Sequence, residues 1–280
     1  MASFDLIVAT VDRVEEVDRL LSSLERQTHR DFRVLLADQN GDDRLAEVLA
    51  GHGSLDIQPV RAPRGLSRAR NVALGLVQAD VVAFPDDDCI FPDDLLARVA
   101  DRFDDEAALD GLTGRAADSD GRSSPSWPRD ATVLTRENLW NRAISFTIFL
   151  SAPLVKAVGP FDEQLGLGTE TPWSSGEEID YLIRTLDRHA RIEYDPDLVV
   201  VHDVPSFTPD TLRAIGARDG ASIGYLLRKH RYPRRRVARM LLRPAGGAVL
   251  ATLRNDRARA RFHVSTLRGR LLGYRATSAA

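Results

Sequence analysis

The chain has 280 residues, of which 43% are hydrophobic and 28% charged, and its formal net charge of −3 is ordinary for a folded globular protein. No run of about 18 apolar residues is present, which argues against a membrane-spanning helix, and the single cysteine excludes an internal disulfide. Because Met1 leads almost directly into the predicted first strand around residues 4–8, we expect no signal peptide, and the single cysteine fits the reducing cytoplasm.

The first hundred residues alternate between strand and helix patterns, which favours an α/β fold with a mostly parallel sheet. Short apolar runs predict strands at residues 6–9, 32–37, 57–60 and 81–84. Apolar residues at helical spacing predict helices at residues 14–24, 44–49 and 64–76. The alternation therefore predicts a layer of strands flanked by helices.

The pattern weakens beyond Leu112. Residues 115–135 are polar and rich in serine, aspartate and proline, so we expect a mobile loop or an irregular insertion there. Further strands are predicted at 146–150 and 198–201, with a short helix at 154–158 and another beginning near Ser175. From about Pro209 onward the sequence is helical in pattern and increasingly basic.

Three consecutive aspartates, Asp86, Asp87 and Asp88, follow the predicted strand at 81–84. Adjacent carboxylates repel one another and persist most easily beside a hard divalent cation such as Mg²⁺ or Mn²⁺. Open α/β sheets bind ligands at the carboxyl ends of their strands, where this aspartate triplet is expected to lie. The alternative is an acidic turn exposed to water. Because no glycine-rich phosphate loop is present, a cation on the triplet is the predicted means of holding a phosphate.

A second candidate site lies at the start of the helix near Ser175. If Ile179 and Leu182 belong to its buried stripe, Glu177 points roughly opposite the core and Glu178 lies beside the stripe. A carboxylate at the edge of an apolar face can have a raised pKa and act as a general base. The alternative is that these acids only complement the helix dipole.

Four single residues stand at positions where a ligand is plausible. Asp38 ends the second predicted strand, where it either accepts a hydrogen bond from a nucleobase or caps a turn. His202 ends the last strand and is either a boundary residue or a metal ligand. Trp173, in a loop, is a candidate for stacking on a sugar ring, whereas Cys89 is interpreted as a small buried thiol.

Taken together, these segments resemble the family-two inverting glycosyltransferases, which have the GT-A fold and a DxD motif. The matching segments, in the order the family has them, are Val8–Arg13, Leu21–Thr28, Asp38–Asp43, Gly65–Asn71, Phe84–Asp88, Gly159–Glu163 and Gly176–Asp180. They cover roughly residues 4–205. The sequence departs from the family pattern at Asp12, where asparagine is common, and at Glu178, where aspartate is usual.

The resemblance implies a GT-A type, Rossmann-like mixed sheet and a role for each candidate residue. Around the nucleotide it places Thr10, Arg13, Asp38, Arg70, Asp86 and Asp87. On the metal, Mn²⁺ or Mg²⁺, it places Asp88, with Asp86 and His202 as further ligands. Glu178 aligns with the catalytic base, Glu177 is its neighbouring alternative, and Trp173 and Asp180 are expected to bind the acceptor.

The implied function is metal-dependent transfer of a sugar from a nucleoside diphosphate sugar to an acceptor hydroxyl, with inversion at the anomeric carbon. Such transfer would serve polysaccharide, glycolipid or secondary-metabolite assembly. Two alternatives remain at this point: a nucleotidyltransferase acting on sugar phosphates, and an inactive protein that binds sugar nucleotides. A nucleotidyltransferase needs a second phosphate site, for which the acidic part of the chain shows no basic signature.

The charge is distributed unevenly, with 14 arginines and one lysine against one carboxylate in residues 228–280. We therefore predict a catalytic domain over residues 1–205 and a basic helical region over residues 206–280. Its mixture of cations and apolar residues predicts contact with an anionic membrane surface or a lipid-linked acceptor, hence a peripheral position on the inner face of the membrane. The alternative is a pair of arginine-rich helices covering the acidic body. No motif supports binding of nucleic acid.

Overall fold

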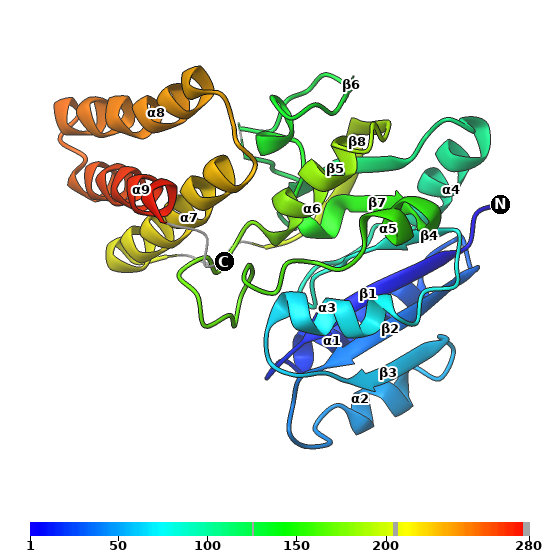
Figure 1. Ribbon diagram of the computed structural model, residues 1–280. Helices are drawn as coiled ribbons and strands as arrows, with labels where there is room; N and C mark the ends of the chain where they lie inside the picture. Colours follow the sequence, from blue (N-terminus) through cyan, green and yellow to red (C-terminus); the bar gives the residue numbers. More distant parts are fainter. Residues whose placement is uncertain (125, 204–206, 277–280) are drawn as a thin grey trace. The chain divides into compact units, whose positions relative to one another are not determined.

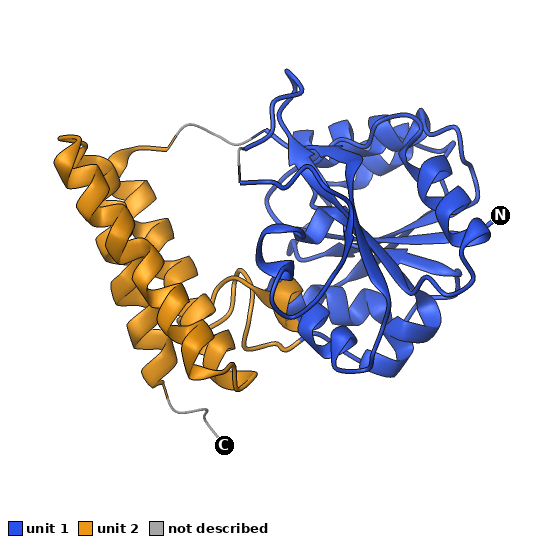
Figure 2. Ribbon diagram, turned by 90° about the horizontal axis from the view of Figure 1, so that it is seen from above, with its two compact units in different colours: residues 1–161, 181–204 blue, residues 162–180, 205–280 orange. Residues whose placement is uncertain are grey.

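The computed structural model describes residues 1–124, 126–203 and 207–276 (Figure 1). The chain divides into two units, the first made of residues 1–161 and 181–204 and the second of residues 162–180 and 205–280 (Figure 2). The division falls within helix α6 (Glu177–Leu186), between Asp180 and Tyr181.

The first unit is built on one mixed sheet. Its strands are β1 (Phe4–Thr10), β2 (Phe32–Asp38), β3 (Ile57–Arg61), β4 (Val81–Ala83), β5 (Gly111–Ala117), β6 (Thr132–Val133), β7 (Ile148–Ser151) and β8 (Ile192–Val201). Within the described residues the strand order is β3-β2-β1-β4-β7-β5-β8-β6, and only β6 and β7 run antiparallel to their neighbours. The strands that precede the candidate site residues, β1, β2, β4 and β8, therefore end at the same edge of the sheet.

The register of the strands sets which residues meet at that edge. Thr10 at the end of β1 is opposite Asp38 at the end of β2, which in turn is opposite Arg61 at the end of β3. An isolated bridge joins Ala9 to Asp86, just beyond β4. The same pairing that builds the sheet thus brings several sequence-predicted residues to one edge.

Helices pack against both faces of the sheet. They are α1 (Glu15–Glu25), α2 (Ala46–Gly51), α3 (Leu66–Leu74), α4 (Leu95–Asp105), α5 (Ala152–Val158) and α6, with short 3₁₀ turns at Leu139–Asn141 and Ser145–Thr147. Apolar side chains of α1 and α4 form one core with alternate residues of β1 and β2. On the other face α3 contacts β1 and β2, and α5 contacts β4 and β7.

The second unit contains three long helices, α7 (Pro209–Lys229), α8 (Arg234–Leu253) and α9 (Arg257–Arg275). Helix α9 packs against both α7 and α8 (Figure 1). Glycines allow α7 and α9 to approach closely, because a Cβ on Gly224 would lie 2.1 Å from the carbonyl oxygen of Arg270 and one on Gly273 would lie 1.9 Å from that of Ala221. Any larger side chain at these two positions would push the helices apart.

The predicted fold class is confirmed: helices flank a mostly parallel mixed sheet, and basic helices follow it. The expectation of a loop over 115–135 was wrong at both ends, since residues 115–117 belong to β5 and residues 132–133 form β6. These short segments gain their strand structure from pairing with β8, which local composition does not reveal. Helix α4 was not predicted. The units differ from the predicted division in assigning residues 162–180 to the C-terminal helices.

Candidate active site

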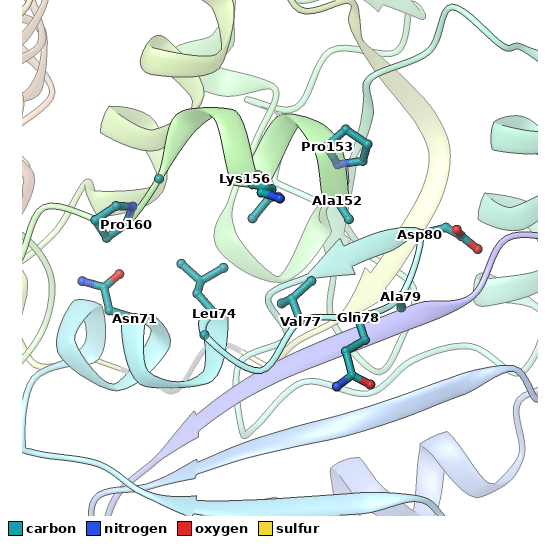
Figure 3. A pocket seen from close by; sticks show the side chains of 13 residues that line it. Asn71, Leu74, Val77, Gln78, Ala79, Asp80, Ala152, Pro153, Lys156 and Pro160 are labelled. Atoms are coloured by element: carbon teal, nitrogen blue, oxygen red, sulfur yellow. The ribbon is translucent and has the colours of Figure 1, made fainter.

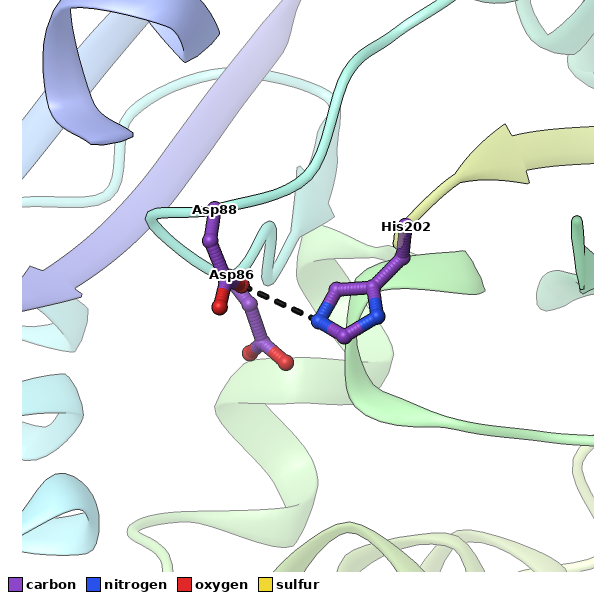
Figure 4. Close-up of side chains that lie close together, drawn as sticks. All are labelled: Asp86, Asp88 and His202. Carbon is purple, nitrogen blue, oxygen red and sulfur yellow. Dashed lines mark ion pairs between the residues drawn. The ribbon is translucent and has the colours of Figure 1, made fainter. Parts of the chain in front are cut away.

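The aspartate triplet lies just beyond β4 at the carboxyl edge of the sheet, as the sequence predicts. Of its members, Asp86 and Asp88 lie close to His202, which follows β8 (Figure 4). One ligand atom from each of these three side chains falls within 4.8 Å of the others. Two carboxylates and an imidazole at this spacing form a donor set that suits Mn²⁺, and with added water ligands Mg²⁺.

Asp88 connects the triplet to His202. The Nε2 atom of His202 lies 3.1 Å from Oδ1 of Asp88, and the other carboxylate oxygen accepts a hydrogen bond from Arg13. Burial raises the pKa of Asp88, but these two hydrogen bonds outweigh it and lower the pKa to about 2. The same contact with Asp88 raises the pKa of His202, whose ring stacks on Phe146 at a centroid distance of 4.8 Å. Asp88 is therefore ionised and His202 is held in a fixed orientation.

Asp86 faces a different set of partners. Its Oδ1 atom accepts hydrogen bonds from Arg70 Nη2 and Ser145 Oγ, both at 3.0 Å. Arg70 is 1% exposed, and its guanidinium lies over the ring of Phe161 at 5.6 Å. Burial raises the pKa of Asp86 despite these contacts. The sequence did not identify Ser145, because its only signal is a serine just before a strand.

Asp87 lies between the other two aspartates and contacts Arg13, whose Nη1 is 3.1 Å from Asp87 Oδ1. Burial raises the pKa of Asp87 to about 6, although Thr10 and Arg13 favour its ionised form. Thr10, Arg13 and Arg70 thus all lie beside the triplet, where the sequence predicted residues around the nucleotide. When all three carboxylates of the triplet are ionised and His202 is neutral, they carry one more negative charge than Arg13 and Arg70 neutralise.

Asp38 is buried at the end of β2 and is fully engaged within the protein. It accepts hydrogen bonds from the backbone and side-chain amides of Asn40 at 2.9 and 2.8 Å, and from Arg61 Nη1 at 2.7 Å. Arg61 also donates to the carbonyl oxygens of Asn40 and Asp42, so it orders the turn after β2. Sequence analysis missed Arg61, whose signal is its position at the end of the neighbouring strand.

The first turn of α6 belongs to the second unit, and its acids are more enclosed than predicted. Glu177, expected to point roughly opposite the core, is only 5% exposed, so that expectation was wrong. The helical spacing marked one apolar stripe, but α7 also covers this turn: a Cβ on the preceding Gly176 would lie 2.9 Å from the side chain of Leu226. Glu178 is half-buried.

Asp180 is fully buried in the same turn. It accepts hydrogen bonds from Lys229 Nζ at 2.6 Å and pairs with His230 Nε2 at 2.7 Å. Lys229 also contacts Asp162 at 2.6 Å, and these carboxylates raise the pKa of Lys229 although burial opposes that shift. We name Asp162, Asp180, Lys229 and His230 the helix cluster. Lys229 and His230 could not be linked to Asp180 from sequence, since they lie about fifty residues away.

Trp173 and Cys89, the other two residues considered from the sequence, both have defined surroundings. The indole of Trp173 stacks on Tyr225 of α7, with centroids 4.8 Å apart and planes 9° apart, so one of its faces is already covered. Cys89 is fully buried, which confirms the sequence interpretation, and burial raises the pKa of its thiol.

A large groove lies elsewhere in the first unit. It has a volume of about 1010 Å³ and is lined mainly by apolar residues of α3, α5 and the segments beside them (Figure 3). Lys156 and Asp80 are its charged residues, and Asp80 precedes β4 at the end opposite the triplet. None of the predicted site residues lines this groove, so we assign no chemistry to it.

Comparison with known proteins decides the family. Residues 5–155, more than half of the chain, match the profile of glycosyl transferase family 2. The chain belongs to this family. The triplet and the residues around it at the ends of β1, β2 and β4 all fall within the segment that matches family 2.

A curated relative within reach of sequence comparison is the pre-mycofactocin glycosyltransferase of Mycobacterium tuberculosis, found in two strains. It is 25% identical over 213 residues, which cover 71% of this chain and 42% of the relative. The chain thus spans less than half the length of the curated relative that it matches.

Solved structures resemble almost the whole chain. A mannosyltransferase, PcManGT from Pyrobaculum calidifontis, in complex with GDP-Man and Mn²⁺, has a TM-score of 0.67 at 15% identity, covering 97% of this chain and 87% of its own. S. aureus TarS 1–349 in complex with UDP-GlcNAc has a TM-score of 0.65 at 17% identity, covering 95% and 90%. These likenesses confirm the predicted GT-A type fold for this member of family 2. Among the helices that the structure describes, none has the length and apolar character needed to span a bilayer.

Proposed function

We propose that this chain is a metal-dependent inverting glycosyltransferase that moves a sugar from a nucleoside diphosphate sugar to an acceptor hydroxyl. The observation that carries the proposal is the grouping of Asp86, Asp88 and His202 at the carboxyl edge of the sheet in a member of family 2. The solved structures with GDP-Man and Mn²⁺ and with UDP-GlcNAc support a donor of this class. The acceptor would belong to a polysaccharide, glycolipid or secondary metabolite.

Asp88, Asp86 and His202 would hold Mn²⁺ or Mg²⁺. The donor set fits such a cation, and the excess negative charge of the triplet favours one. When bound, the cation supplies Lewis-acid stabilisation of the negative charge that develops on the departing nucleoside diphosphate. His202 is oriented for this task by its stacking on Phe146.

The nucleotide would lie along the same edge of the sheet. Thr10 and Arg13 border the triplet. The half-exposed guanidinium of Arg13 can turn toward a phosphate oxygen, and such a charged donor binds phosphate more strongly than a neutral donor does. Arg70 fixes Asp86, which together with Asp87 would face the ribose. Asp38, held by Arg61, would lie near the nucleobase.

Glu178 is the proposed general base, with Glu177 as its alternative in the same turn. The base takes the proton from the acceptor hydroxyl, whose oxygen attacks the anomeric carbon from the face opposite the leaving group. The bond between that carbon and the diphosphate oxygen breaks, and its electron pair leaves with the nucleoside diphosphate. Inversion follows from this single displacement.

The acceptor is expected near the first turn of α6. Trp173, whose second face remains a candidate for stacking on a sugar, would contact the acceptor directly. Because Asp180 is fully buried against Lys229 and His230, we propose that it supports acceptor binding by fixing this turn. We also propose that transfer takes place at an anionic membrane surface on the cytoplasmic side, which the basic composition of residues 228–280 supports.

The proposal is tested by incubating the full chain with UDP-, dTDP- and GDP-sugars and measuring release of the nucleoside diphosphate. We expect release from one donor class with Mn²⁺ and its loss with a chelator. Release of pyrophosphate from a nucleoside triphosphate and a sugar phosphate would instead identify a nucleotidyltransferase. If the chain binds a sugar nucleotide but turns over none of the donors, it would be the inactive binding protein.

A pair of matched variants assigns the base. Glu178→Gln keeps size and hydrogen bonding but cannot take a proton, so we expect transfer to fall by about a hundredfold or more while the protein stays folded. Glu177→Gln, one residue away, should keep most of the activity. The reverse pattern would make Glu177 the base, and near-normal transfer by both variants would overturn the assignment of the base to this turn.

A further inference from the structure

Helix α8 presents an unusual outer surface. Leu242, Val249, Leu250 and Leu253 are 68%, 61%, 48% and 78% exposed, and the spacing of three, four and seven residues between them puts all four on one side of the helix. Among the described residues, ten large apolar side chains are exposed in this way, and four of them belong to this single helix. Scattered apolar residues are ordinary on a surface, whereas a row along one helix indicates a contact.

The row is not part of the packing within the second unit. The residues of α8 that are buried are Val237, Met240, Pro244 and Ala251, which recur at the same helical spacing on the other side. Helix α9 packs against α8, whereas no comparable contact joins α8 to α7 in the part of the chain described. The apolar row therefore lies on the side of α8 that its own helical unit leaves uncovered.

Arginines flank the row. Arg235, Arg239 and Arg243 lie on the same side of α8, and Arg254 follows directly after its last residue; all four are exposed. Helix α8 holds five arginines and no acidic residue. Within residues 207–276, no carboxylate forms an ion pair with any of these four arginines. Among the described residues, no ion pair thus neutralises their charge.

We propose that this surface, the outer face of α8 formed by Arg235, Arg239, Leu242, Arg243, Val249, Leu250, Leu253 and Arg254, binds the headgroup region of an anionic lipid bilayer. The proposal extends the membrane location proposed above by naming the helix and side that make contact, but it does not depend on catalysis. It also narrows the contact from the whole basic region predicted over residues 206–280 to one face of α8 and the residue after it, residues 235–254.

The chemistry of the face matches such a surface in two respects. Four unpaired guanidiniums attract anionic headgroups, each contributing to binding as long as it stays within a Debye length of the membrane. Four exposed aliphatic side chains can enter the boundary between headgroups and acyl chains, as in helices that lie in the plane of the interface. Arginine stems are long enough to remain at headgroup level while the leucines insert.

The test is flotation of the full chain with vesicles of phosphatidylcholine alone and with vesicles of equimolar phosphatidylcholine and phosphatidylglycerol. We expect binding to the anionic vesicles only, weakened by added salt. Leu250→Ser/Leu253→Ser should lower the partition coefficient by about tenfold, and Arg239→Gln/Arg243→Gln by about fivefold for each arginine removed. Because all four side chains are exposed, these variants should fold normally, which circular dichroism verifies.

Matched controls remove the same groups from other surfaces. Val133→Ser/Leu167→Ser replaces side chains that are 46% and 55% exposed, and Arg19→Gln/Arg213→Gln removes two exposed charges. Both control variants should bind vesicles like the unaltered chain. Equal loss in the control and α8 variants would show that net charge or apolar content alone matters, which would overturn the assignment to this face.

Other outcomes would also overturn the proposal. The first two are no binding to either kind of vesicle and equal binding to both. The third is a dimer in sedimentation velocity that Leu250→Ser/Leu253→Ser abolishes, in a chain that does not bind vesicles. Such a dimer would make this face an interface between copies of the chain. Binding of single-stranded DNA in place of vesicles, lost in the arginine variant, would likewise overturn the proposal. Mn²⁺-dependent release of nucleoside diphosphate separates the two proposals. Release by the unaltered chain without vesicle binding would leave only catalysis standing, and vesicle binding without release would leave only the membrane contact. Unchanged release by α8 variants that have lost vesicle binding supports both.

Discussion

Two groups of carboxylates in this protein are neutralised in contrasting ways. In the helix cluster the buried Asp180 meets both Lys229 and His230, and Lys229 also meets Asp162, so the protein supplies a basic partner for each carboxylate. In the aspartate triplet, three consecutive carboxylates share Arg13 and Arg70, and burial still raises the pKa of Asp86 and Asp87. The triplet therefore places three adjacent carboxylates on two guanidiniums, whereas each carboxylate of the helix cluster is hydrogen-bonded to a basic side chain.

The contrast separates a site built for stability from a site built for a ligand. A buried ion pair with several hydrogen bonds resists the loss of any member, because the remaining charge is left buried and unpaired. A group of carboxylates that costs stability persists where an external cation completes it. The comparison thus predicts opposite consequences when one carboxylate is removed from each group.

The largest effect is expected for Asp88→Asn. The change removes a proposed metal ligand while keeping the size of the side chain, and we expect Mn²⁺-dependent turnover to fall by about a thousandfold, or about 4 kcal/mol. The rise in melting temperature that Mn²⁺ gives the unaltered chain should also disappear. Calorimetric scans with and without Mn²⁺, together with the donor assay, measure both quantities.

A control for this variant is Asp93→Asn, which removes a nearby carboxylate that is 60% exposed and paired with Arg26. It should keep both turnover and the response to Mn²⁺. If Asp88→Asn retained them as well, the triplet would not be the metal site, and the contrast with the helix cluster would lose its chemical meaning.

The second effect is a loss of stability in Asp180→Asn. The variant leaves Lys229 and His230 without their fully buried partner, and we expect the free energy of unfolding of the second unit to fall by about 3 kcal/mol. Urea unfolding followed by circular dichroism and by tryptophan fluorescence measures the change. Asp162→Asn is the matched control: its carboxylate is 23% exposed and Lys229 keeps Asp180, so the loss should be about 1 kcal/mol or less. Equal stability of Asp180→Asn and the unaltered chain would mean that the helix cluster is not what holds this turn.

Much of the fold could be predicted because its signals are local. Alternating strand and helix patterns mark β1 to β4 with α1 to α3, and polar residues directly after apolar runs mark where the strands end. Since carboxyl ends of parallel strands meet at one edge, placing the triplet and His202 together required only the chain order and the direction of the strands. The segments that depend on partners far away, β6 and the first residues of β8, carried no such signal.

The site could be predicted in its residue types but not in its pairings. Nothing local indicates that Arg61 holds Asp38, that Ser145 holds Asp86 or that Lys229 holds Asp180, because each contact joins residues at least twenty positions apart. The predicted orientation of Glu177 was wrong for the same reason, since a single apolar stripe along a helix cannot show that a second helix covers the other side. Spacing identifies candidates, and tertiary packing decides which charges remain free to act.

The last prediction concerns Asp87→Asn, which should stabilise the protein. Burial raises the pKa of Asp87 from its ordinary value of 3.8 to about 6, so the folded state holds its proton more tightly than the unfolded state does. Above pH about 6 the ionised Asp87 thus costs the folded state stability, and a neutral amide in its place removes that cost, a gain of about 2 kcal/mol after loss of the contact with Arg13. As the pH falls from about 6 to 3.8, Asp87 takes up its proton in the folded state and the difference between variant and unaltered chain should shrink to nothing. Urea unfolding across this pH range measures the difference in the free energy of unfolding. A variant that is less stable than the unaltered chain above pH about 6 would show that Arg13 stabilises the ionised Asp87 as fully as Lys229 and His230 stabilise Asp180.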